Sequence, residues 1–416
     1  MKRIFAFALV VSFLFSLNAG ALIAVNGSFS ALVSENGENI VLPGAFAGIF
    51  KITDGLYSVK SSETGKFSLM TEKCEMLTES KYTLFIKIAE NAVLFEQDGK
   101  YGVMDEKANM TVPPEYTWIV SNGAGGYLAL RTDVWDNTPD GVYLIDETGY
   151  VSPTGVKVAS FLMEFSEGLS PALSTENGKY GYLNCEGQWE IRPQYAYADA
   201  FLGGIAVATL DSGSGVIDKK GSWQITPKYD FVDIGNRNGP AIACVDYEGS
   251  VTVFSKDTFE KAYSFDQDLM GAYVSVSGDS IIAYFDDRVA EFDFSGNEIA
   301  SVSSRGYLFP AQSGYTIGYD DENAFLTDSF GKRVLDGYRE LTELTDDGEN
   351  VYFTFVKGEV TVDGYRVGVV DQTGREILPC SYTSVIVPEE GYLQAENENG
   401  MYLFTLTGEP VWKYEY

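Results

Sequence analysis

Two stretches of the sequence decide the fold: residues 178–195 read GKYGYLNCEGQWEIRPQY, and residues 212–229 read SGSGVIDKKGSWQITPKY. Both contain a Gly, two apolar residues, and then Asn or Asp. A second Gly follows three positions later, and a Pro and a Tyr stand at the end. The same register recurs over residues 99–116 and 365–382, although Ala108 replaces the later Gly in the first of these. Self-similarity at a fixed spacing is the signature of a repeat architecture.

We call the position of the Asn or Asp in this pattern, which is Asn184 in the first stretch and Asp218 in the second, the anchor of the repeat. In the four clearest copies a Tyr follows the anchor by eleven residues, and weaker copies keep the anchor with a Gly three positions on, or fit by spacing alone. The anchors stand at 34, 71, 105, 146, 184, 218, 255, 293, 328, 371 and 405, a mean step of about 37 residues. The array therefore covers residues 22–416 in about ten to eleven units and is degenerate over 240–345.

The chemistry of one unit predicts two strands joined by a turn. Asp at position i with Gly at i+3 is typical of a type I turn, and an alternating segment such as Trp223-Gln-Ile225 predicts a strand after it. We expect the following Pro to end strand pairing, because it has no N–H to donate, and the Tyr after it to pack between units. The structural repeat residues predicted in this way are Asp105, Tyr116, Asp146, Gly149, Gly181, Gly187, Tyr195, Asp218, Gly221, Tyr229, Asp371, Gly374 and Tyr382.

The length of the unit restricts the architecture. Segments rich in Tyr, Phe, Val and Ile precede many anchors, and no helical period is sustained beyond the first residues, so the fold class is all-β. Four strands of about five residues with short turns nearly fill the unit, as in a β-propeller blade. Stacked hairpins in an open β-solenoid are the alternative. Because closure removes exposed sheet edges, we favour a propeller-like arrangement.

The repeat resembles the WG (KWG) repeat, a unit of bacterial-type β-repeat proteins. Phe165-Ser-Glu-Gly-Leu169 and Gly204-Ile-Ala-Val207 are similar to its first block, Gly178-Lys-Tyr-Gly-Tyr-Leu-Asn184 to its second, and Ile225-Thr-Pro-Lys-Tyr-Asp230 to its third. The Trp of the motif is replaced here by Tyr101, Tyr180, Ser214 and Val367. The resemblance implies a secreted or cell-surface β-repeat array that binds something, and it brings no catalytic residues.

Residues 1–21 predict a secretory signal peptide. Lys2 and Arg3 precede an apolar run over 4–17, and Ala19-Gly20-Ala21 provides a small-residue cleavage site. The run is shorter than the roughly 20 residues that span a bilayer, and no later stretch is long enough. We therefore expect a secreted or cell-surface protein with no membrane span in the mature chain.

Composition excludes several classes of function. The chain contains no His, which removes imidazole-dependent catalysis and most zinc sites. Its formal net charge of −31 disfavours nucleic acid, whose phosphates require Lys and Arg. The cysteines Cys74, Cys185, Cys244 and Cys380 are far apart. Three disulfide pairings are open to them in a secreted chain, and we expect buried free thiols instead.

One segment has the spacing of a calcium loop. Asp136, Thr138 and Asp140 occupy positions 1, 3 and 5, Gly141 position 6 and Glu147 position 12. The repeat offers another explanation of this spacing, because Gly141 leads into a repeat strand and Glu147 lies in the turn after the anchor Asp146. No other cofactor is indicated.

Three hypotheses of function remain open. The first is a non-catalytic binding module for a polysaccharide, a cell-wall polymer or a protein partner, for which we expect exposed aromatic side chains at equivalent positions of several units. The second is a glycoside hydrolase or lyase, which needs one unrepeated pair of carboxylates in a cleft. The third is a structural surface protein with neither feature. The anchor carboxylates recur at a turn position, so we interpret them as turn formers.

Overall fold

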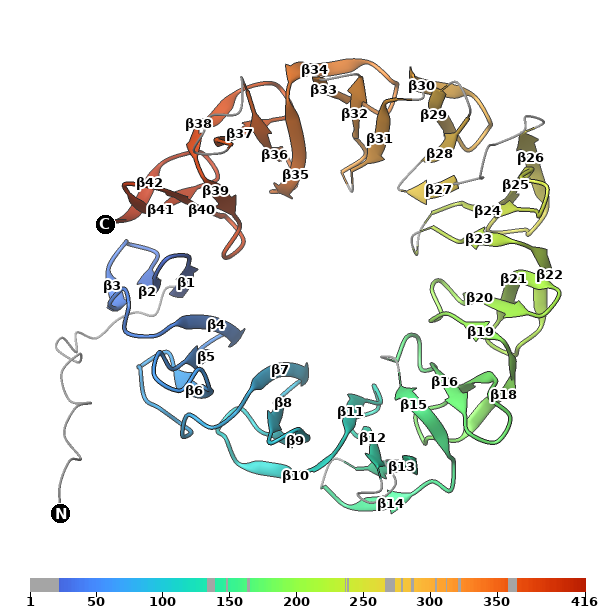
Figure 1. Ribbon diagram of the computed structural model, residues 1–416, viewed down its shortest axis with the longest axis horizontal. Helices are drawn as coiled ribbons and strands as arrows, with labels where there is room; N and C mark the ends of the chain where they lie inside the picture. The colour runs from blue at the N-terminus through green and yellow to red at the C-terminus, as the bar shows by residue number, and fades with distance from the viewer. Residues whose placement is uncertain are drawn as a thin grey trace. The chain divides into compact units, whose positions relative to one another are not determined.

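The computed structural model describes residues 22–132, 139–146, 149–162, 165–235, 237, 239–265, 274–277, 280–285, 288–303, 305–311, 313–320, 323–357 and 365–416. Within these ranges every regular element is a β-strand (Figure 1). The described part of the chain accordingly contains no apolar helix of membrane-spanning length. The signal peptide predicted over 1–21 lies outside the described residues.

The strands of the described residues form eleven separate sheets, each built from strands that follow one another in the sequence. The pairings within the sheets are antiparallel; the first two sheets have three strands and the others four. The first five sheets are β1 (Leu22–Asn26), β2 (Ser30–Ser34), β3 (Asn39–Val41); β4 (Gly48–Thr53), β5 (Leu56–Lys60), β6 (Phe67–Thr71); β7 (Leu84–Ala89), β8 (Ala92–Gln97), β9 (Lys100–Met104), β10 (Met110–Tyr116); β11 (Trp118–Ser121), β12 (Tyr127–Thr132), β13 (Pro139–Ile145), β14 (Val151–Pro153); β15 (Val158–Leu162), β16 (Ser170–Ser174), β17 (Tyr180–Leu183) and β18 (Trp189–Tyr195).

The later sheets have the same meander of four strands. They are β19 (Tyr197–Ala198), β20 (Ile205–Leu210), β21 (Gly213–Asp218), β22 (Trp223–Tyr229); β23 (Phe231–Asp233), β24 (Ala241–Val245), β25 (Val251–Ser255), β26 (Lys261–Phe265); β27 (Val274–Ser277), β28 (Ser280–Tyr284), β29 (Arg288–Asp293), β30 (Glu298–Ser303); β31 (Tyr307–Pro310), β32 (Thr316–Asp320), β33 (Asn323–Thr327), β34 (Arg333–Tyr338); β35 (Glu340–Asp346), β36 (Val351–Val356), β37 (Val367–Asp371), β38 (Glu376–Tyr382); β39 (Ser384–Ile386), β40 (Tyr392–Asn397), β41 (Gly400–Thr405) and β42 (Pro410–Glu415).

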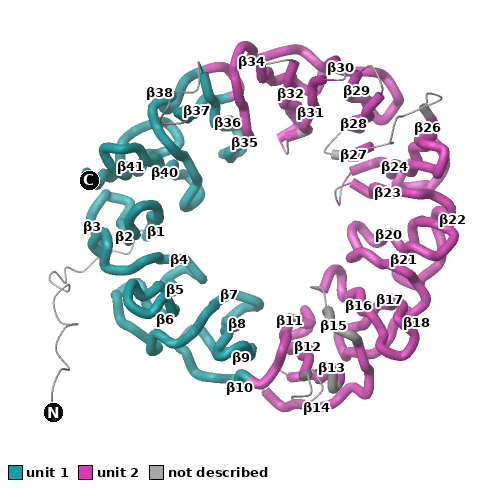
Figure 2. Tube along the Cα trace, viewed as in Figure 1, with its two compact units in different colours: residues 1–114, 344–371, 375–416 teal, residues 115–343, 372–374 magenta. Residues whose placement is uncertain are grey.

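The chain divides into two compact units (Figure 2). Unit 1 takes residues up to 114 together with 344–371 and 375–416, so it holds both the first and the last sheets. Unit 2 takes residues 115–343 and 372–374. In unit 1 the first and last sheets share a core in which Ile23 and Val25 pack with Leu403 and Trp412. The side chain of Gln394 on β40 also accepts a hydrogen bond from the backbone N–H of Asn26 at 3.0 Å.

The predicted fold class is confirmed. A four-stranded antiparallel meander is the blade of a β-propeller, and the degenerate stretch 240–345 builds such sheets as well (β23–β26, β27–β30, β31–β34). The eleven anchors lie at equivalent places, since each stands at the turn that precedes the outermost strand segment of its sheet. In the second sheet that outermost segment is reduced to two isolated bridges, Met70 with Met76 and Phe67 with Tyr82.

The anchor turn is closed by its own side chain. The carbonyl of Asp218 accepts the N–H of Gly221 at 2.9 Å, and its Oδ1 accepts the N–H groups of Lys220 and Ser222 at 2.8 and 2.9 Å. Asp105 does the same over Lys107 and Asn109, and Oδ1 of Asp146 accepts the N–H of Tyr150. Short polar side chains that bond the backbone ahead of them favour turns over strands, and this is why the anchor interrupts each meander.

The turn glycines also contact the preceding sheet. Gly221 has φ +78°, a conformation that L side chains rarely adopt, and a Cβ there would lie 3.1 Å from the side chain of Ile191. Gly187 has φ +71° and faces Thr154 in the same way. Gly149 and Gly374 have φ +82° and +90°. Glycine therefore favours the backbone conformation of these turns, which Ala108 adopts as well with φ +63°, and at Gly187 and Gly221 it also allows close packing.

The prediction that the repeat Pro ends strand pairing is wrong. Pro193 lies inside β18, and pairing resumes beyond it, because Tyr182 opposes Ile191 and Tyr180 opposes Tyr195. The residues between these pairs form a bulge, where a missing N–H costs no ladder hydrogen bond. Gly181 faces this bulge: a Cβ on it would lie 2.5 Å from the carbonyl oxygen of Ile191 and 2.7 Å from the nitrogen of Pro193. The repeat Gly and the repeat Pro are thus two parts of one contact.

The repeat tyrosines are buried where neighbouring sheets meet. Tyr116, Tyr195, Tyr229 and Tyr382 are at most 9% exposed. Tyr195 contacts Trp223 of the next sheet edge-on, with ring centroids 5.8 Å apart. The other three contact Tyr143, Phe254 and Phe404 of the following sheets at 6.3, 6.1 and 6.0 Å. Such pairs add about 0.5–1.5 kcal/mol beyond the area they bury, so these tyrosines stabilise the stacking of sheets.

Candidate functional site

The predicted calcium loop lies outside the part of the chain that can be assessed. Asp136, Thr138 and Glu147 are outside the described residues, and of Asp140 only the backbone, in β13, is described. Among the residues that are described, no group of three or more Asp, Glu or Cys side chains is arranged to hold a metal ion.

In several sheets of unit 2 the first strand begins with an aromatic residue. Tyr197 and Phe231 each lie two positions after a repeat Tyr and directly before a buried residue of the same strand, Ala198 or Val232. Trp118 stands at the same position of β11. Tyr307 stands at the equivalent position of β31, before the buried Leu308. We call Trp118, Tyr197, Phe231 and Tyr307 the aromatic row.

The aromatic row lies on the inner strands of its sheets in unit 2 (Figure 1). In each sheet the strand that carries the aromatic residue is the innermost one, as the strand labels in Figure 1 show for β11, β19, β23 and β31. Tyr197 is 44% exposed, Phe231 41% and Tyr307 55%, whereas Trp118 is half-buried. Four of the six sheets of unit 2 thus present a large aromatic side chain at one equivalent position.

Neighbouring groups hold these side chains in place. Tyr197 contacts Tyr180 edge-on at 5.8 Å, and Tyr307 stacks on Phe309, two residues along the same strand, at 6.2 Å. The hydroxyl of Tyr197 also interacts with the carboxylate of Asp199, which raises the pKa of this tyrosine. Burial raises the pKa of Asp199, and the hydrogen bond from Tyr197 opposes that rise. The row is therefore partly preorganised before any ligand arrives.

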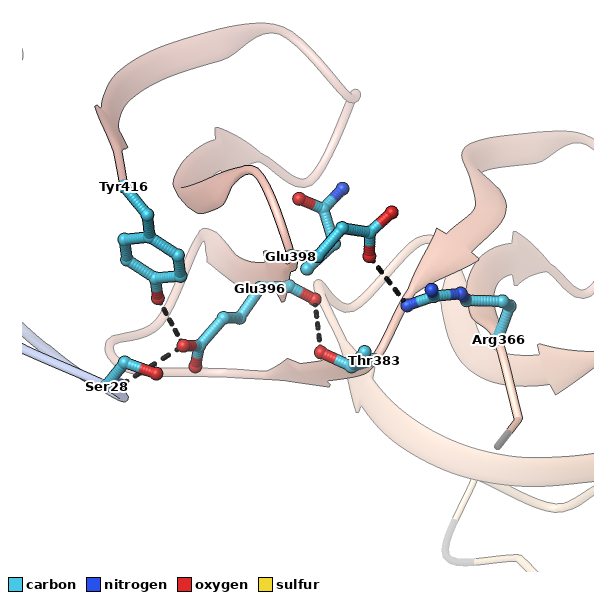
Figure 3. Close-up of a pocket in the computed structure, with 7 residues that line it drawn as sticks. Ser28, Arg366, Thr383, Glu396, Glu398 and Tyr416 are labelled. Atoms are coloured by element: carbon cyan, nitrogen blue, oxygen red, sulfur yellow. Dashed lines mark hydrogen bonds and ion pairs between the residues drawn. The ribbon is translucent and has the colours of Figure 1, made fainter. Parts of the chain in front are cut away.

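Unit 1 contains a polar cavity of about 560 Å³ (Figure 3). We call it the hairpin cavity because two hairpins border it, β1–β2 with Ser28 in its turn and β40–β41 with Glu396 and Asn397 at the end of β40 and Glu398 in the turn. Arg366, Thr383 and Tyr416 complete its lining.

Hydrogen bonds fix the walls of the hairpin cavity. The carboxylate of Glu396 accepts the backbone N–H of Ser28 at 3.2 Å and the hydroxyl of Tyr416. The hydroxyl of Thr383 donates to the backbone carbonyl of Glu396 at 2.8 Å, and Arg366 pairs with Glu398 at 3.0 Å. Gly27 allows this approach, because a Cβ there would lie 2.4 Å from Oε2 of Glu396.

The two carboxylates of this cavity do not form an acid–base pair. Burial would raise the pKa of Glu396, but hydrogen bonds from Ser28 and Tyr416 outweigh it and leave the pKa below its usual value. Burial, and then the hydrogen bond with Glu396, raise the pKa of Tyr416 to about 12. A glycosidase acid needs a carboxyl whose pKa is raised. The shift of Glu396 is opposite to the one such an acid needs, and Glu398 is paired with Arg366.

The four cysteines are free thiols. Cys244 is completely buried, and burial raises its pKa to about 12. The other three are half-buried, so the expectation of buried thiols holds fully for Cys244 alone. Thiols with raised pKa values are poor nucleophiles at neutral pH.

The aromatic row was visible in the sequence but was missed. Trp118, Tyr197 and Phe231 each follow a repeat Tyr by two residues, so aligning the segments after the repeat Tyr reveals a recurrent aromatic position. Tyr307 has no such marker, because residue 305 is Arg rather than Tyr. The hairpin cavity has no sequence signal, since Ser28 and Glu396 are 368 residues apart.

Comparisons with known proteins support the repeat and say little more. No curated protein matches the sequence. Solved structures that resemble the chain include BamB from Moraxella catarrhalis (12% identity, TM-score 0.30, covering 68% of this chain and 92% of that one). They also include Hsv2 from Kluyveromyces lactis (10%, 0.31, 64% and 94%) and apo AztD from Citrobacter koseri (11%, 0.31, 88% and 93%). No function is transferred from these likenesses.

A family model gives the clearest match. The model described as "WG containing repeat" matches residues 101–133, 180–212, 215–248 and 368–402. These segments include the clearest copies of the repeat and the contact between the repeat Gly and the Pro bulge. The match identifies the chain as a protein that contains WG repeats.

Proposed function

We propose that this protein is a non-catalytic binding module and that the aromatic row of unit 2 contacts its ligand, a polysaccharide or related cell-wall polymer. A β-propeller built from repeats serves as an interaction or scaffold module, and the row gives unit 2 a specific surface. The single observation that carries the proposal is the recurrence of an exposed aromatic side chain at one strand position of several sheets.

Repetition of the contact suits a repetitive ligand. An aromatic side chain offers a large, rigid apolar face that can cover a sugar ring at a small cost in conformational entropy. One weak contact per sheet becomes strong when several sheets engage the same chain, because later contacts form at high effective concentration. A polymer with many equivalent units gains most from this arrangement.

The charge of the protein restricts the polymer. A net charge of −31 repels polyanions and favours uncharged or cationic ligands. We also propose that residues 1–21 direct the chain out of the cell, where such polymers occur. N-terminal sequencing of protein recovered from culture medium tests this: a chain that starts near residue 22 supports it, and an intact Met1 in the cell contradicts it.

The test of the row is retention on insoluble polymers. The purified protein is passed over cellulose, chitin and peptidoglycan, and compared with a triple variant Tyr197→Ala, Phe231→Ala, Tyr307→Ala. The matched control replaces three exposed aromatic residues on turns or loops of the same unit: Tyr150→Ala, Tyr247→Ala and Phe330→Ala. Each truncation of an exposed contact is worth about 1 kcal/mol or more, so three should abolish retention.

The expected result is that the row variant loses retention on at least one polymer and the turn variant keeps it. Equal retention by all three proteins contradicts the role of the row. Absence of retention on every polymer contradicts the polysaccharide, and pull-down of a protein partner by the wild type but not by the row variant would then identify the ligand as protein.

A further inference from the structure

The hairpin cavity of unit 1 has the chemistry of a second binding site, separate from the aromatic row. Its polar groups converge from segments far apart in the sequence: the β1–β2 turn, the segment before β37, the β40–β41 turn and the C-terminal end of the described chain. A volume of about 560 Å³ is within the range of roughly 300–1,000 Å³ that holds small ligands.

Two carboxylates, those of Glu396 and Glu398, give this cavity its charged hydrogen-bond acceptors. The carboxylates of Glu396 and Glu398 accept hydrogen bonds and, when ionised, donate none. Arg366 supplies the main donors, and it already pairs with Glu398. A ligand that complements the cavity must therefore bring several donors of its own. Hydroxyl groups that donate to carboxylates form short, charge-assisted hydrogen bonds, about twice as strong as neutral ones.

An aromatic cluster borders the cavity. Tyr416, which lines it, is 51% exposed and lies 5.7 Å from the ring of Phe29 on the β1–β2 turn. Tyr414 contacts both rings, at 5.6 Å from Phe29 and 6.3 Å from Tyr416. The hydroxyl of Tyr416 is fixed on Glu396, so its ring has a defined direction (Figure 3). Carboxylate acceptors beside a fixed, exposed tyrosine ring match a sugar, whose edge carries hydroxyls and whose faces are apolar.

We propose that the hairpin cavity binds a single neutral sugar unit, with the sugar hydroxyls donating to Glu398 and Glu396 and a face of the sugar against Tyr416. The cavity that holds the sugar is lined by both the first and the last sheets of unit 1. Binding should therefore raise the melting temperature of the protein, since a ligand that binds only the folded state stabilises it. This site does not rest on the function proposed for the aromatic row.

The experiment uses the full-length mature protein and three soluble probes: methyl β-glucoside, methyl β-galactoside and methyl N-acetyl-β-glucosaminide. Melting temperature and calorimetric titration are measured for each probe. The fully O-methylated form of each binding sugar is the ligand control, because methylation removes the donors and keeps the ring. We expect at least one probe to bind with a Kd of about 1 mM, as a small ligand with few contacts does, and its O-methylated form to have no effect.

Two variants locate the site. Glu398→Gln and Tyr416→Ala should each weaken binding about tenfold, or about 1.4 kcal/mol, since the first replaces a charged acceptor with a neutral one and the second removes the aromatic face. Both side chains are largely exposed, so the variants should fold. The matched control is Asp98→Asn, because Asp98 occupies the same place in the β8–β9 turn, two residues after Glu96, as Glu398 does after Glu396.

The outcomes separate the two proposals. Sugar binding that falls in Glu398→Gln and Tyr416→Ala, and persists in Asp98→Asn and in the triple variant of the aromatic row, supports the hairpin cavity. Saturable binding by none of the three probes overturns it. Binding that is unaffected by Glu398→Gln and Tyr416→Ala overturns it as well, and binding lost only in the row variant assigns the sugar to the row.

Discussion

Two sheets contain the same cross-strand pair of Phe and Gly in opposite order. One is β7–β10, where a family match begins, and the other is β31–β34, in the degenerate stretch. In the first, Phe95 on β8 pairs with Gly102 on β9. In the second, the pair is reversed: Gly318 on β32 opposes Phe325 on β33. Both phenylalanines are at most 2% exposed. These two sheets thus keep the combined volume of the cross-strand pair and not the residue at either position.

The bulge on the outermost strand adapts to this reversal. In the family-like sheets a glycine on the third strand faces a bulge that contains Pro, as Gly181 faces Pro193. In β33–β34 the third-strand residue is the large Phe325, and the bulge holds Gly337 with φ +76° instead of a Pro. Arg333 lies over the ring of Phe325, 3.6 Å from its centre. A sequence pattern based on Gly and Pro misses such a sheet, although its architecture is the same.

The largest effect should come from removing the phenylalanine of either pair. Phe95→Ala and Phe325→Ala should each lower the free energy of unfolding by about 3–5 kcal/mol, because each leaves a cavity in a closed core. Denaturant titration followed by tryptophan fluorescence measures the loss. The control is Phe330→Ala, in the exposed turn between β33 and β34. It should change the free energy of unfolding by no more than about 0.5 kcal/mol. Equal losses for Phe325→Ala and Phe330→Ala would refute the pairing.

The next effect tests whether the pair can be reversed. A Cβ on Gly318 would lie 2.0 Å from the ring of Phe325, so Gly318→Phe should destabilise the protein by about 3 kcal/mol through overpacking. Adding Phe325→Gly recreates the order of β7–β10 and should recover most of this loss. Thermal unfolding of the two single variants and the double variant measures the coupling. Additive losses in the double variant would show that total volume does not govern the pair.

A third test compares neighbouring sheets at the position of Glu167, where the next sheet has Gly203. The carboxylate of Glu167 accepts the N–H groups of Gly203 and Gly204 at 2.7 and 2.9 Å and pairs with Lys219 and Arg237. Its side chain is only 10% exposed. Glu167→Gln should therefore cost about 2 kcal/mol at neutral pH, through loss of charge-assisted hydrogen bonds.

The pH dependence of that cost has a defined sign. Burial would raise the pKa of Glu167, but hydrogen bonds from Gly204 and Gly203 and the contact with Lys219 outweigh it and lower the pKa below 4.5. The stabilisation is therefore present above pH 4.5 and is lost as the pH falls through the lowered pKa. Denaturant titrations at several pH values should show wild type and Glu167→Gln converging in acid. Glu176→Gln, exposed in the same sheet, should show no such convergence.

The smallest effect concerns the anchor itself, which is Asp293 in a degenerate repeat and Asn184 in a regular one. Both side chains offer Oδ1 to two backbone N–H groups ahead of them. Asp293→Asn should cost about 0.5 kcal/mol, because Oδ1 is kept and only the hydrogen bond from Nδ2 of Asn297 to Oδ2 is lost, whereas Asp293→Ala should cost about 1 kcal/mol. Thermal unfolding compares them, and equal losses would mean that the charge, not the turn hydrogen bonds, matters.

The sequence was sufficient for features whose cause is local. The anchor turn was predictable from Asp218 and Gly221 because a short polar side chain and a positive φ act within four residues. The role of Pro193 was not, because it depends on Gly181 across the sheet. The reversed pair of Gly318 and Phe325 left the sheet β31–β34 with its anchor turn, Asp328 and Gly331, as the repeat signal. The hairpin cavity depends on contacts between Ser28 and Glu396, which no local rule relates.

The contact between the first and last sheets has a consequence for synthesis. Ile23 and Val25 are covered by residues such as Leu403 and Trp412, and Asn26 is bonded to Gln394, 368 residues later. At roughly 5–20 residues per second, the ribosome needs about 20–70 s to make the intervening chain. During that interval the first sheet lacks its partner and shows apolar surface to whatever surrounds the nascent chain. The risk of non-native contacts by this sheet therefore begins early in translation and ends when the last strands cover it.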